Sequence, residues 1–437
     1  MGEKLGALLS VGARHKCADA VCVVGAGFSG VMAAYRLALS GYPVCLVDLS
    51  RRPGGVMQDD FIESRPHLSG CHLIQQDVPE AYGFKLPAKD QLVSSPNQVS
   101  SWTRSSTGIQ RESNVEGPIS CANPLDWNST GFSRPNRQRE SLGDRLQAYP
   151  DEVRLELLQW TTSLGLDSDR LHQDSLEALQ LRRVYFPSRY RDVLQELKNQ
   201  DSKADELFGV APRDLRQVLI AKNGYSRWFE AAVVELMELG VHYRPGAAAK
   251  PSIRSGQIRL ELDGESFTPP LGFWCANPNP LGKALMPGVR WDGQSKLLTA
   301  WHVEVDQGAD SALSYVQFFG HPYGVIRATK YQFGGIQRVV VESLASTRRA
   351  AGTAAPSVLE AAQETGAVPR ALLGNFTRRS YLTMSVTDSH HLQEMGQRLN
   401  DLGWIHSGLQ YFSRPRKLAW LDEEIRNRAV LTDETLE

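Results

Sequence analysis

The sequence predicts an α/β protein in which a Rossmann-like nucleotide-binding domain is interrupted by a helical segment and by an antiparallel β-sheet domain. Three observations support this fold class. An apolar run over residues 20–24 leads through a glycine-rich turn into residues 31–39, which have helical apolar spacing. Helical spacing returns over residues 150–223. Apolar and polar residues then alternate over residues 296–343, as is typical of antiparallel strands.

The glycine-rich turn has the sequence "GAGFSG" and lies between the first strand and the first helix. In this pattern Gly25 permits a tight turn, Gly27 lets the backbone approach a diphosphate, and Gly30 lets the helix pack on the strand. The helix N-terminus then attracts the anion. A second strand, "PVCLVDL", ends in Asp48, where a carboxylate would accept the ribose hydroxyls. The pattern predicts an adenine dinucleotide without a 2′-phosphate; the alternative is a glycine turn with no ligand.

The segment "SRRPGG" directly after this strand favours FAD over NAD. Gly54 and Gly55 allow a second close approach of backbone to ligand, and Arg52 adds a guanidinium for a diphosphate. A longer dinucleotide that runs on toward a flavin needs such an additional contact. The alternative is an ordinary solvent-exposed loop.

The composition is that of a small-molecule enzyme. Lys plus Arg number 48 and Asp plus Glu 49, so no net field attracts nucleic acid or an acidic membrane surface. No apolar run is long enough to span a membrane. The six cysteines form no CxxC pair and no Cys/His cluster with metal spacing, which argues against a metal site and a disulfide framework. We therefore expect reduced thiols and a cytoplasmic location.

The order of the patterns predicts three parts. The FAD-binding domain is expected over residues 18–90, 215–282 and 385–437, the antiparallel-sheet substrate domain over 91–149 and 283–384, and the helical insertion over 150–214. Residues 91–145 are rich in Ser, Asn, Gly and Pro and predict loops and edge strands. The segment "AWLDEEIRNRAVL" predicts a last helix. The helical insertion offers a surface through which an oligomer could form.

Several segments together resemble UDP-galactopyranose mutase, a flavoprotein family related to the protoporphyrinogen oxidases and amine oxidases. They are "GAGFSGVMAAYRLALSGYPVCLVDLSRRPGG", "SGCHLI", "NGYSRWFEAAVVEL", "PYGVIRATKY", "RSYLTMSV", "SGLQYF" and "WLDEEI". The resemblance covers most of the chain except residues 90–150. It implies an FAD cofactor that lies across the first strand-to-helix turn, with its ring covered by the later sheet.

The resemblance also assigns individual residues. Those that would contact the adenosine and diphosphate are Gly25, Gly27, Ser29, Gly30, Asp48, Arg52, Gly54 and Gly55. Those that would approach the flavin pyrimidine and ribityl chain are Gly408, Leu409, Leu421 and Asp422, the last two opening the final helix. His72 would lie beside the isoalloxazine, with Arg327 and Tyr381 on the substrate side. Without the family, His72 is better explained as a buried or capping histidine, and Arg327 as a solvated charge.

The departures from the family bear on the reaction. Ser407 precedes Gly408 and Leu409 where the family has Gly-Arg-Leu, and Gln75 replaces a second histidine. A UDP-sugar would lose part of its diphosphate clamp, at about 1.5–3 kcal/mol for each lost charge-assisted hydrogen bond.

These departures favour an FAD-dependent oxidoreductase or monooxygenase for a small polar metabolite, which would use oxygen or an external electron donor and for which the cofactor supplies the reactivity. The alternatives are a mutase that uses the reduced flavin N5 as nucleophile, and a catalytically inert flavin-binding scaffold.

Overall fold

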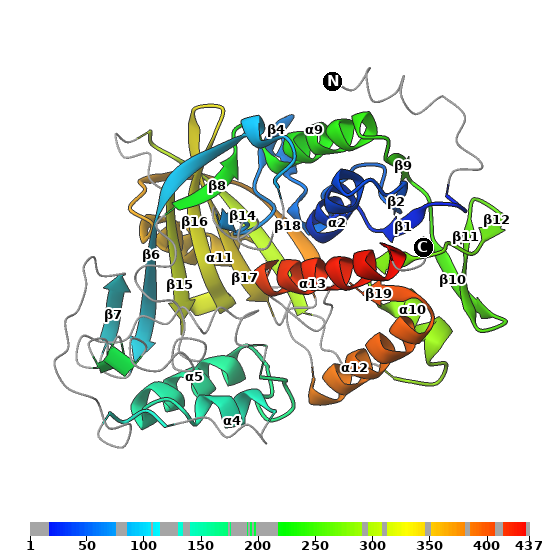
Figure 1. Ribbon diagram of the computed structural model, residues 1–437. Coiled ribbons are helices and arrows are strands. Elements are labelled where there is room, and N and C mark those ends of the chain that lie inside the picture. The colour runs from blue at the N-terminus through cyan, green and yellow to red at the C-terminus, as the bar shows by residue number, and fades with distance from the viewer. Residues whose placement is uncertain are drawn as a thin grey trace.

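The computed structural model contains a parallel sheet that carries the glycine-rich turn (Figure 1). The structure describes residues 17–75, 85–105, 108–113, 130–133, 140–173, 175, 190, 193–194, 196–197, 217–290, 296–307, 313–345, 351–380, 385–406 and 414–433. Within them, five parallel strands lie in the order β19 (Trp404–His406), β13 (Gly272–Trp274), β1 (Val21–Val24), β2 (Val44–Asp48) and β9 (His242–Pro245). The carboxyl ends of β1, β2 and β13 therefore meet at one edge.

Helices from distant parts of the chain surround this sheet. α2 (Phe28–Leu39) follows β1 and contacts both α9 (Tyr225–Glu238) and α13 (Arg414–Asp433). α10 (Asn279–Leu285) and α12 (Val386–Asp401) pack against each other near β19. The buried side of α2 is formed by Val31, Met32, Ala34 and Tyr35, which supply the apolar face that the helical spacing predicts.

A larger mixed sheet stands beside the parallel one. Its order within the described residues is β18 (Pro369–Ser380), β14 (Lys296–Val305), β17 (Ile336–Ala345), β16 (Val325–Phe333), β15 (Leu313–Phe319), β6 (Leu92–Ser105), β8 (Gln217–Ala221) and β5 (Ile74–Gln75), with β7 (Gly108–Ser113) on β6. The pairs from β18 to β15 are antiparallel, whereas β15 and β6 run parallel. The predicted α/β fold with a second, largely antiparallel sheet is confirmed.

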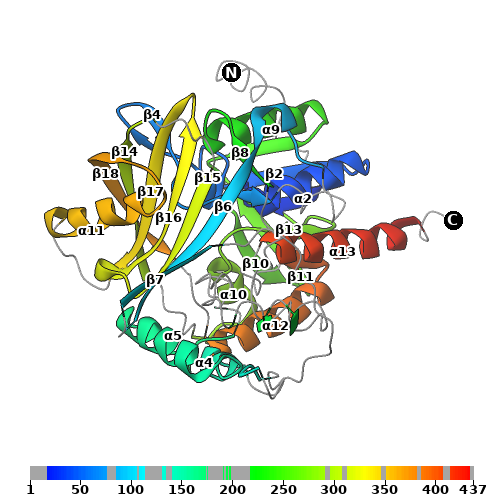
Figure 2. The same ribbon diagram turned by 90° about the vertical axis from the view of Figure 1, so that its left-hand side faces the viewer.

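Residue alternation gives the large sheet two different faces. Val339 and Val341 of β17 pack with α11 (Ala351–Gln363), whereas Val340 joins the core that contains the helices around the parallel sheet. Figure 2 shows the large sheet standing between α11 on one side and α2 with α9 on the other. Side chains that share the orientation of Val340, such as Tyr331, thus face the parallel sheet and its helices.

The remaining elements are small. They are the sheet of β10 (Lys250–Arg254), β11 (Gln257–Leu262) and β12 (Glu265–Phe267), the hairpin of β3 (Asp60–Ile62) and β4 (Arg65–His67), helices α4 (Leu142–Leu146) and α5 (Asp151–Ser163), and the 3₁₀ turns η1 (Gly55–Met57), η2 (Lys89–Gln91) and η5 (Pro322–Gly324). α4 and α5 pack under one end of the large sheet (Figure 1).

Two predictions about strands are wrong. β6 is not an edge strand. Its residues 92–96 pair with β8 and its residues 97–103 pair with β15, so β6 connects these two strands within the sheet. Pro96 lies where β6 leaves β8 and meets β15, which is the place where a strand tolerates a missing N–H. β8 is a strand of the large sheet, although helical spacing was predicted up to residue 223, and β11 lies in the small three-stranded sheet rather than in the parallel sheet. The domain boundaries stay a prediction.

The expectation of reduced thiols is wrong for one pair of cysteines. Cys17 and Cys45 form a disulfide with their Cα atoms 5.2 Å apart, and Cys22 lies directly opposite Cys45 on the neighbouring strand. The spacing of Cys17 and Cys45 gave no signal for this bond, because Cys17 reaches β2 only through the turn that precedes β1. The cytoplasmic location stays a prediction.

No helix of the described residues has the length and apolar character needed to cross a membrane.

Candidate functional site

The first glycine turn is shaped by contacts within the protein. Gly25 has φ +104°, and a Cβ placed there would lie 2.9 Å from the backbone of Cys275 and Ala276. A Cβ on Gly30 would lie 1.7 Å from the carbonyl oxygen of Gly25. Both positions therefore require glycine for the fold itself.

Gly27 is different, because the protein leaves room for a side chain there. The nearest atom to a Cβ on Gly27 is the Cα of Gly55 at 3.8 Å, an ordinary contact, and its φ of −77° suits any residue. Gly27 is also the N-cap of α2, and no described side chain caps that helix end or places an acid in its first turn. Uncapped N–H groups at a helix N-terminus fit a diphosphate. Ser29, in the first turn, is partly exposed at this end.

Asp48 stands at the end of β2, beside the turn. Its Oδ2 accepts the N–H of Ala26 and its Oδ1 accepts the N–H of Ser50 at 2.6 Å. Burial raises the pKa of this carboxyl, while the two backbone donors oppose that shift. Each oxygen keeps a lone pair that could accept a hydroxyl, so the residue fits the ribose contact predicted for it.

The second glycine pair packs against the first turn. Gly54, with φ +119°, donates its N–H to the carbonyl of Ala26 at 2.8 Å, and Gly55 approaches the backbone of Gly27. Arg52 is exposed, with its guanidinium 5.7 Å from the centre of the Phe61 ring. The structure thus brings Gly27, Gly54, Gly55 and Asp48 together in an arrangement that fits an adenine dinucleotide, while Arg52 lies against Phe61.

A short loop after β4 connects this turn to the large sheet. Ser69 Oγ donates to the carbonyl of Val56, next to Gly55, at 2.9 Å. Arg378 of β18 donates to the Ser69 carbonyl at 3.3 Å, and the Leu68 N–H donates to the hydroxyl of Tyr331 at 3.3 Å. The loop that carries Gly70, Cys71 and His72 is therefore held from both sides.

Arg327 and His72 both lie next to Glu342, a residue that was not predicted from the sequence. Arg327 Nε donates to Glu342 Oε2, and the Glu342 side chain is fully buried. Burial raises the pKa of Glu342, but Arg327, His72 and the Cys71 N–H lower it, so that the net shift is downward. The signal was present in "RVVVES", where the alternation that buries Val340 also predicts a buried Glu342.

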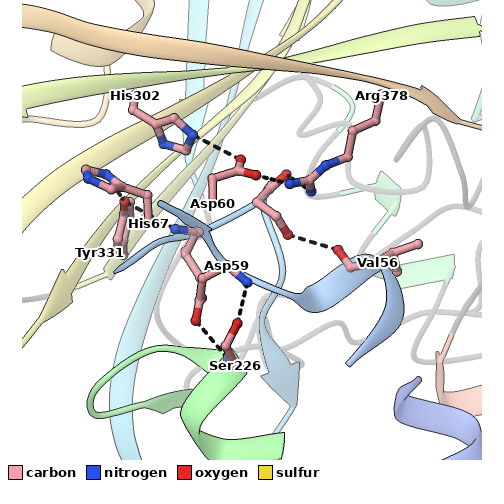
Figure 3. A network of polar contacts seen from close by, with 10 residues as sticks. Val56, Asp59, Asp60, His67, Ser226, His302, Tyr331 and Arg378 are labelled. Atoms are coloured by element: carbon pink, nitrogen blue, oxygen red, sulfur yellow. Dashed lines mark hydrogen bonds and ion pairs between the residues drawn. The ribbon is translucent and has the colours of Figure 1, made fainter. Parts of the chain in front are cut away.

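A second cluster of polar side chains, on the same face of the large sheet, surrounds Asp60 (Figure 3). Its Oδ2 lies 3.1 Å from Nε2 of His302, and Arg378 donates to its Oδ1. The rings of His67 and His302 are 4.9 Å apart, and the hydroxyl of Tyr331 lies 3.3 Å from Nδ1 of His67. Desolvation, with nearby Arg338 as a further cause, lowers the pKa of His67 to about 3 and that of His302 to about 4.

Asp59, which precedes Asp60, gives a structural reason for the glycine in the segment "NGY". Its Oδ1 and Oδ2 accept the N–H groups of Tyr225 and Ser226 at 3.0 and 2.7 Å, which caps helix α9 (Figure 3). A Cβ on Gly224 would lie 2.5 Å from the Asp59 carboxylate. The glycine therefore makes room for the cap.

We expect the free energy of unfolding to fall as the pH is lowered from 6.5 toward 4. A histidine titrates near 6.5 when unfolded, whereas His302 stays neutral in the fold down to about 4, so the unfolded state binds the extra proton first. The loss for His302 alone is about 3 kcal/mol by pH 4. His302→Gln keeps a donor toward Asp60 and should reduce the pH dependence. Urea unfolding at pH 7, 6 and 5 measures both proteins, and equal slopes would contradict a neutral buried His302.

The prediction for the last helix is wrong in its position. α13 begins at Arg414, so Leu421 and Asp422 lie in its interior rather than opening it. Leu421 is part of the apolar core, and Asp422 pairs with Arg36 of α2 at 3.6 Å and with Arg426. These contacts account for both residues within the protein. Tyr381, Gly408 and Leu409 lie outside the described residues, as does Ser407.

In the part of the chain that the structure describes, no group of three His, Cys, Asp or Glu side chains is arranged to hold a metal ion.

The chain is similar to known proteins mainly in its fold. A family model described as an NAD(P)-binding Rossmann-like domain matches residues 23–84. No curated protein sequence matches the chain. The crystal structure of reduced UDP-galactopyranose mutase is similar with a TM-score of 0.64 and 12% identity, over 94% of both chains.

Two further structures are similar over nearly their whole length. An oxidoreductase from Methanosarcina mazei has a TM-score of 0.56 and 11% identity, over 93% of this chain and 99% of that one. A variant of putrescine oxidase has a TM-score of 0.54 and 12% identity, over 94% and 99%. The chain therefore has the fold of UDP-galactopyranose mutase and putrescine oxidase, which confirms, at the level of the fold, the resemblance predicted from its sequence.

Proposed function

We propose that the protein is an FAD-dependent oxidoreductase or monooxygenase that acts on a small polar metabolite. Gly25, Gly27, Gly30 and the N-terminus of α2 would hold the diphosphate, and Asp48 would hold the ribose. When bound, FAD supplies a hydride-accepting ring nitrogen. The protein's own residues then need only to orient the substrate and exclude water.

The observation that carries the redox proposal is the pairing of two of the arginines on the sheet face with buried carboxylates. Arg327 is paired with the buried Glu342, and Arg378 is paired with the buried Asp60. Each guanidinium keeps its positive charge, but its anionic partner already compensates that charge, so neither pair offers a net positive charge to a substrate. A mutase needs cationic groups to hold a diphosphate leaving group, so this face suits a substrate without a diphosphate.

The assignment of roles follows from these contacts. His72, in the loop held by Arg378 and Tyr331, is proposed to exchange a proton with the substrate beside the flavin. Arg327 and Glu342 would lie on the large sheet beneath the position where His72 meets the substrate. Tyr381 stays a proposed member of the site from the resemblance alone. The electron partner is proposed to be oxygen or an external donor.

Absorbance and turnover of the reconstituted protein test the proposal. We expect the protein to take up FAD and turn yellow, to give no product with UDP-galactopyranose under dithionite, and to consume oxygen with a polar metabolite. Formation of the furanose product would overturn the redox proposal in favour of the mutase. Flavin reduction and reoxidation in stopped flow that no candidate substrate accelerates would instead indicate an inert scaffold.

A further inference from the structure

The space beside Gly70 is shared by two functional groups. A Cβ on Gly70 would lie 2.4 Å from Oε1 of Glu342 and 3.2 Å from Nε2 of His72. A carboxylate oxygen and an imidazole nitrogen thus converge on the same point. Gly70 is needed because any side chain would separate them, and this gives a physical reason for the glycine in "SGCHLI".

The two carboxylate oxygens of Glu342 face different neighbours. Its Oε2 accepts Nε of Arg327, which leaves Oε1 as the oxygen that faces Gly70 and His72. The side chain is fully buried, and its pKa lies below its ordinary value because the attraction of Arg327 outweighs the effect of burial. Glu342 is therefore an anion at neutral pH.

We propose that Glu342 is a positioning residue for His72: its Oε1 orients the imidazole and holds a proton at Nε2, while Arg327 limits the negative charge that His72 feels. The inference rests on the proposed function, in which His72 lies beside the bound flavin. It adds a residue from β17 that acts through His72 rather than on the substrate.

Among the described residues, the charged and titratable groups around this point are Glu342 on β17, Arg327 on β16 and Cys71 in the loop itself, together with Tyr315 on β15, which acts on Arg327. Burial, and next the Glu342 carboxylate, raise the pKa of the Cys71 thiol well above its ordinary value, so the thiol stays neutral. The charge on His72 is thus governed by the anionic Glu342 beside it and by the cationic Arg327, which pairs with Glu342.

Histidine titration by NMR in the FAD-free protein tests this arrangement. The protein is labelled with ¹³C- and ¹⁵N-histidine, and His72→Gln assigns the His72 signal among the ten histidines. In Glu342→Gln, loss of the anion should lower the His72 titration midpoint by about half a pH unit or more. In Arg327→Gln, loss of the cation should raise it. A purely structural role would not produce shifts of opposite sign.

Glu304→Gln is the matched control, because Glu304 is an exposed carboxylate on β14 of the same sheet and its removal changes the net charge equally. We expect the His72 midpoint to stay unchanged there. An unchanged midpoint in folded Glu342→Gln overturns the inference. If that variant does not fold, a midpoint that falls or stays constant in Arg327→Gln overturns it. Failure of the protein to bind FAD would overturn the proposed function. The titration, which uses the FAD-free protein, would still test the inference about Glu342.

Discussion

Replacing Arg327 by methionine should lower the free energy of unfolding by about 3–5 kcal/mol. The reason is that Glu342, which is fully buried, would lose its counter-charge and remain an uncompensated anion inside the fold. Glu342→Leu should cost a similar amount, because it leaves the guanidinium of Arg327 buried without its anion. Urea unfolding at pH 7 measures both losses.

The double variant Arg327→Met/Glu342→Leu separates a buried-charge effect from a packing effect. Removing both charges together should restore most of the stability, because no unpaired ion remains. Lys250→Met is the matched control, since the Lys250–Glu261 pair at 3.0 Å is largely exposed and should contribute less than about 1 kcal/mol. Additive losses in the double variant would contradict the pairing.

The local parts of the fold could be predicted from the sequence, because their signals are contiguous. The strand, glycine turn and helix around Gly27 are encoded within about twenty residues, and Asp48 follows directly on the next strand. The start of α13 could also have been found, since Pro415 at its beginning is a typical first-turn residue.

The chemistry of the sheet face could be predicted only in part, because it depends on register between distant strands. Arg327 lies opposite Glu342 across β16 and β17, next to an irregularity in the pairing that no sequence pattern reveals. His72 comes from a loop more than two hundred residues away from both. The sequence therefore predicted two members of this group by resemblance and missed Glu342, which joins them.

Asp60 and Arg378 were missed for the same reason. Asp60 looked like one of two adjacent acids in a polar stretch, and Arg378 like a solvated residue of "TRRS". Their pairing places a second neutralised arginine on the face that a diphosphate would need. The pairing of these two arginines, on which the proposed choice of chemistry rests, is thus a property of the folded chain.

Replacing Gly27 by alanine should reduce FAD affinity at least about 100-fold, equivalent to about 2.7 kcal/mol, while the fold stays intact. The protein itself accepts the methyl group, because the nearest atom lies 3.8 Å away and the backbone of Gly27 has an ordinary conformation. What the methyl group would obstruct is the approach of the diphosphate to the N-terminus of α2. Thermal unfolding with and without added FAD measures the effect, since a bound ligand raises the melting temperature.

Gly30→Ala is the matched variant, because it adds the same methyl group one helical turn away with the opposite consequence. There the Cβ would lie 1.7 Å from the Gly25 carbonyl oxygen, so the turn or the helix must shift, and we expect a loss of about 3 kcal/mol or more of stability without FAD. The pair of variants thus separates a glycine required by a ligand from one required by the fold. If Gly27→Ala bound FAD as the wild type does, the diphosphate would not lie at this turn, and the flavin function proposed for the protein would lose its physical basis.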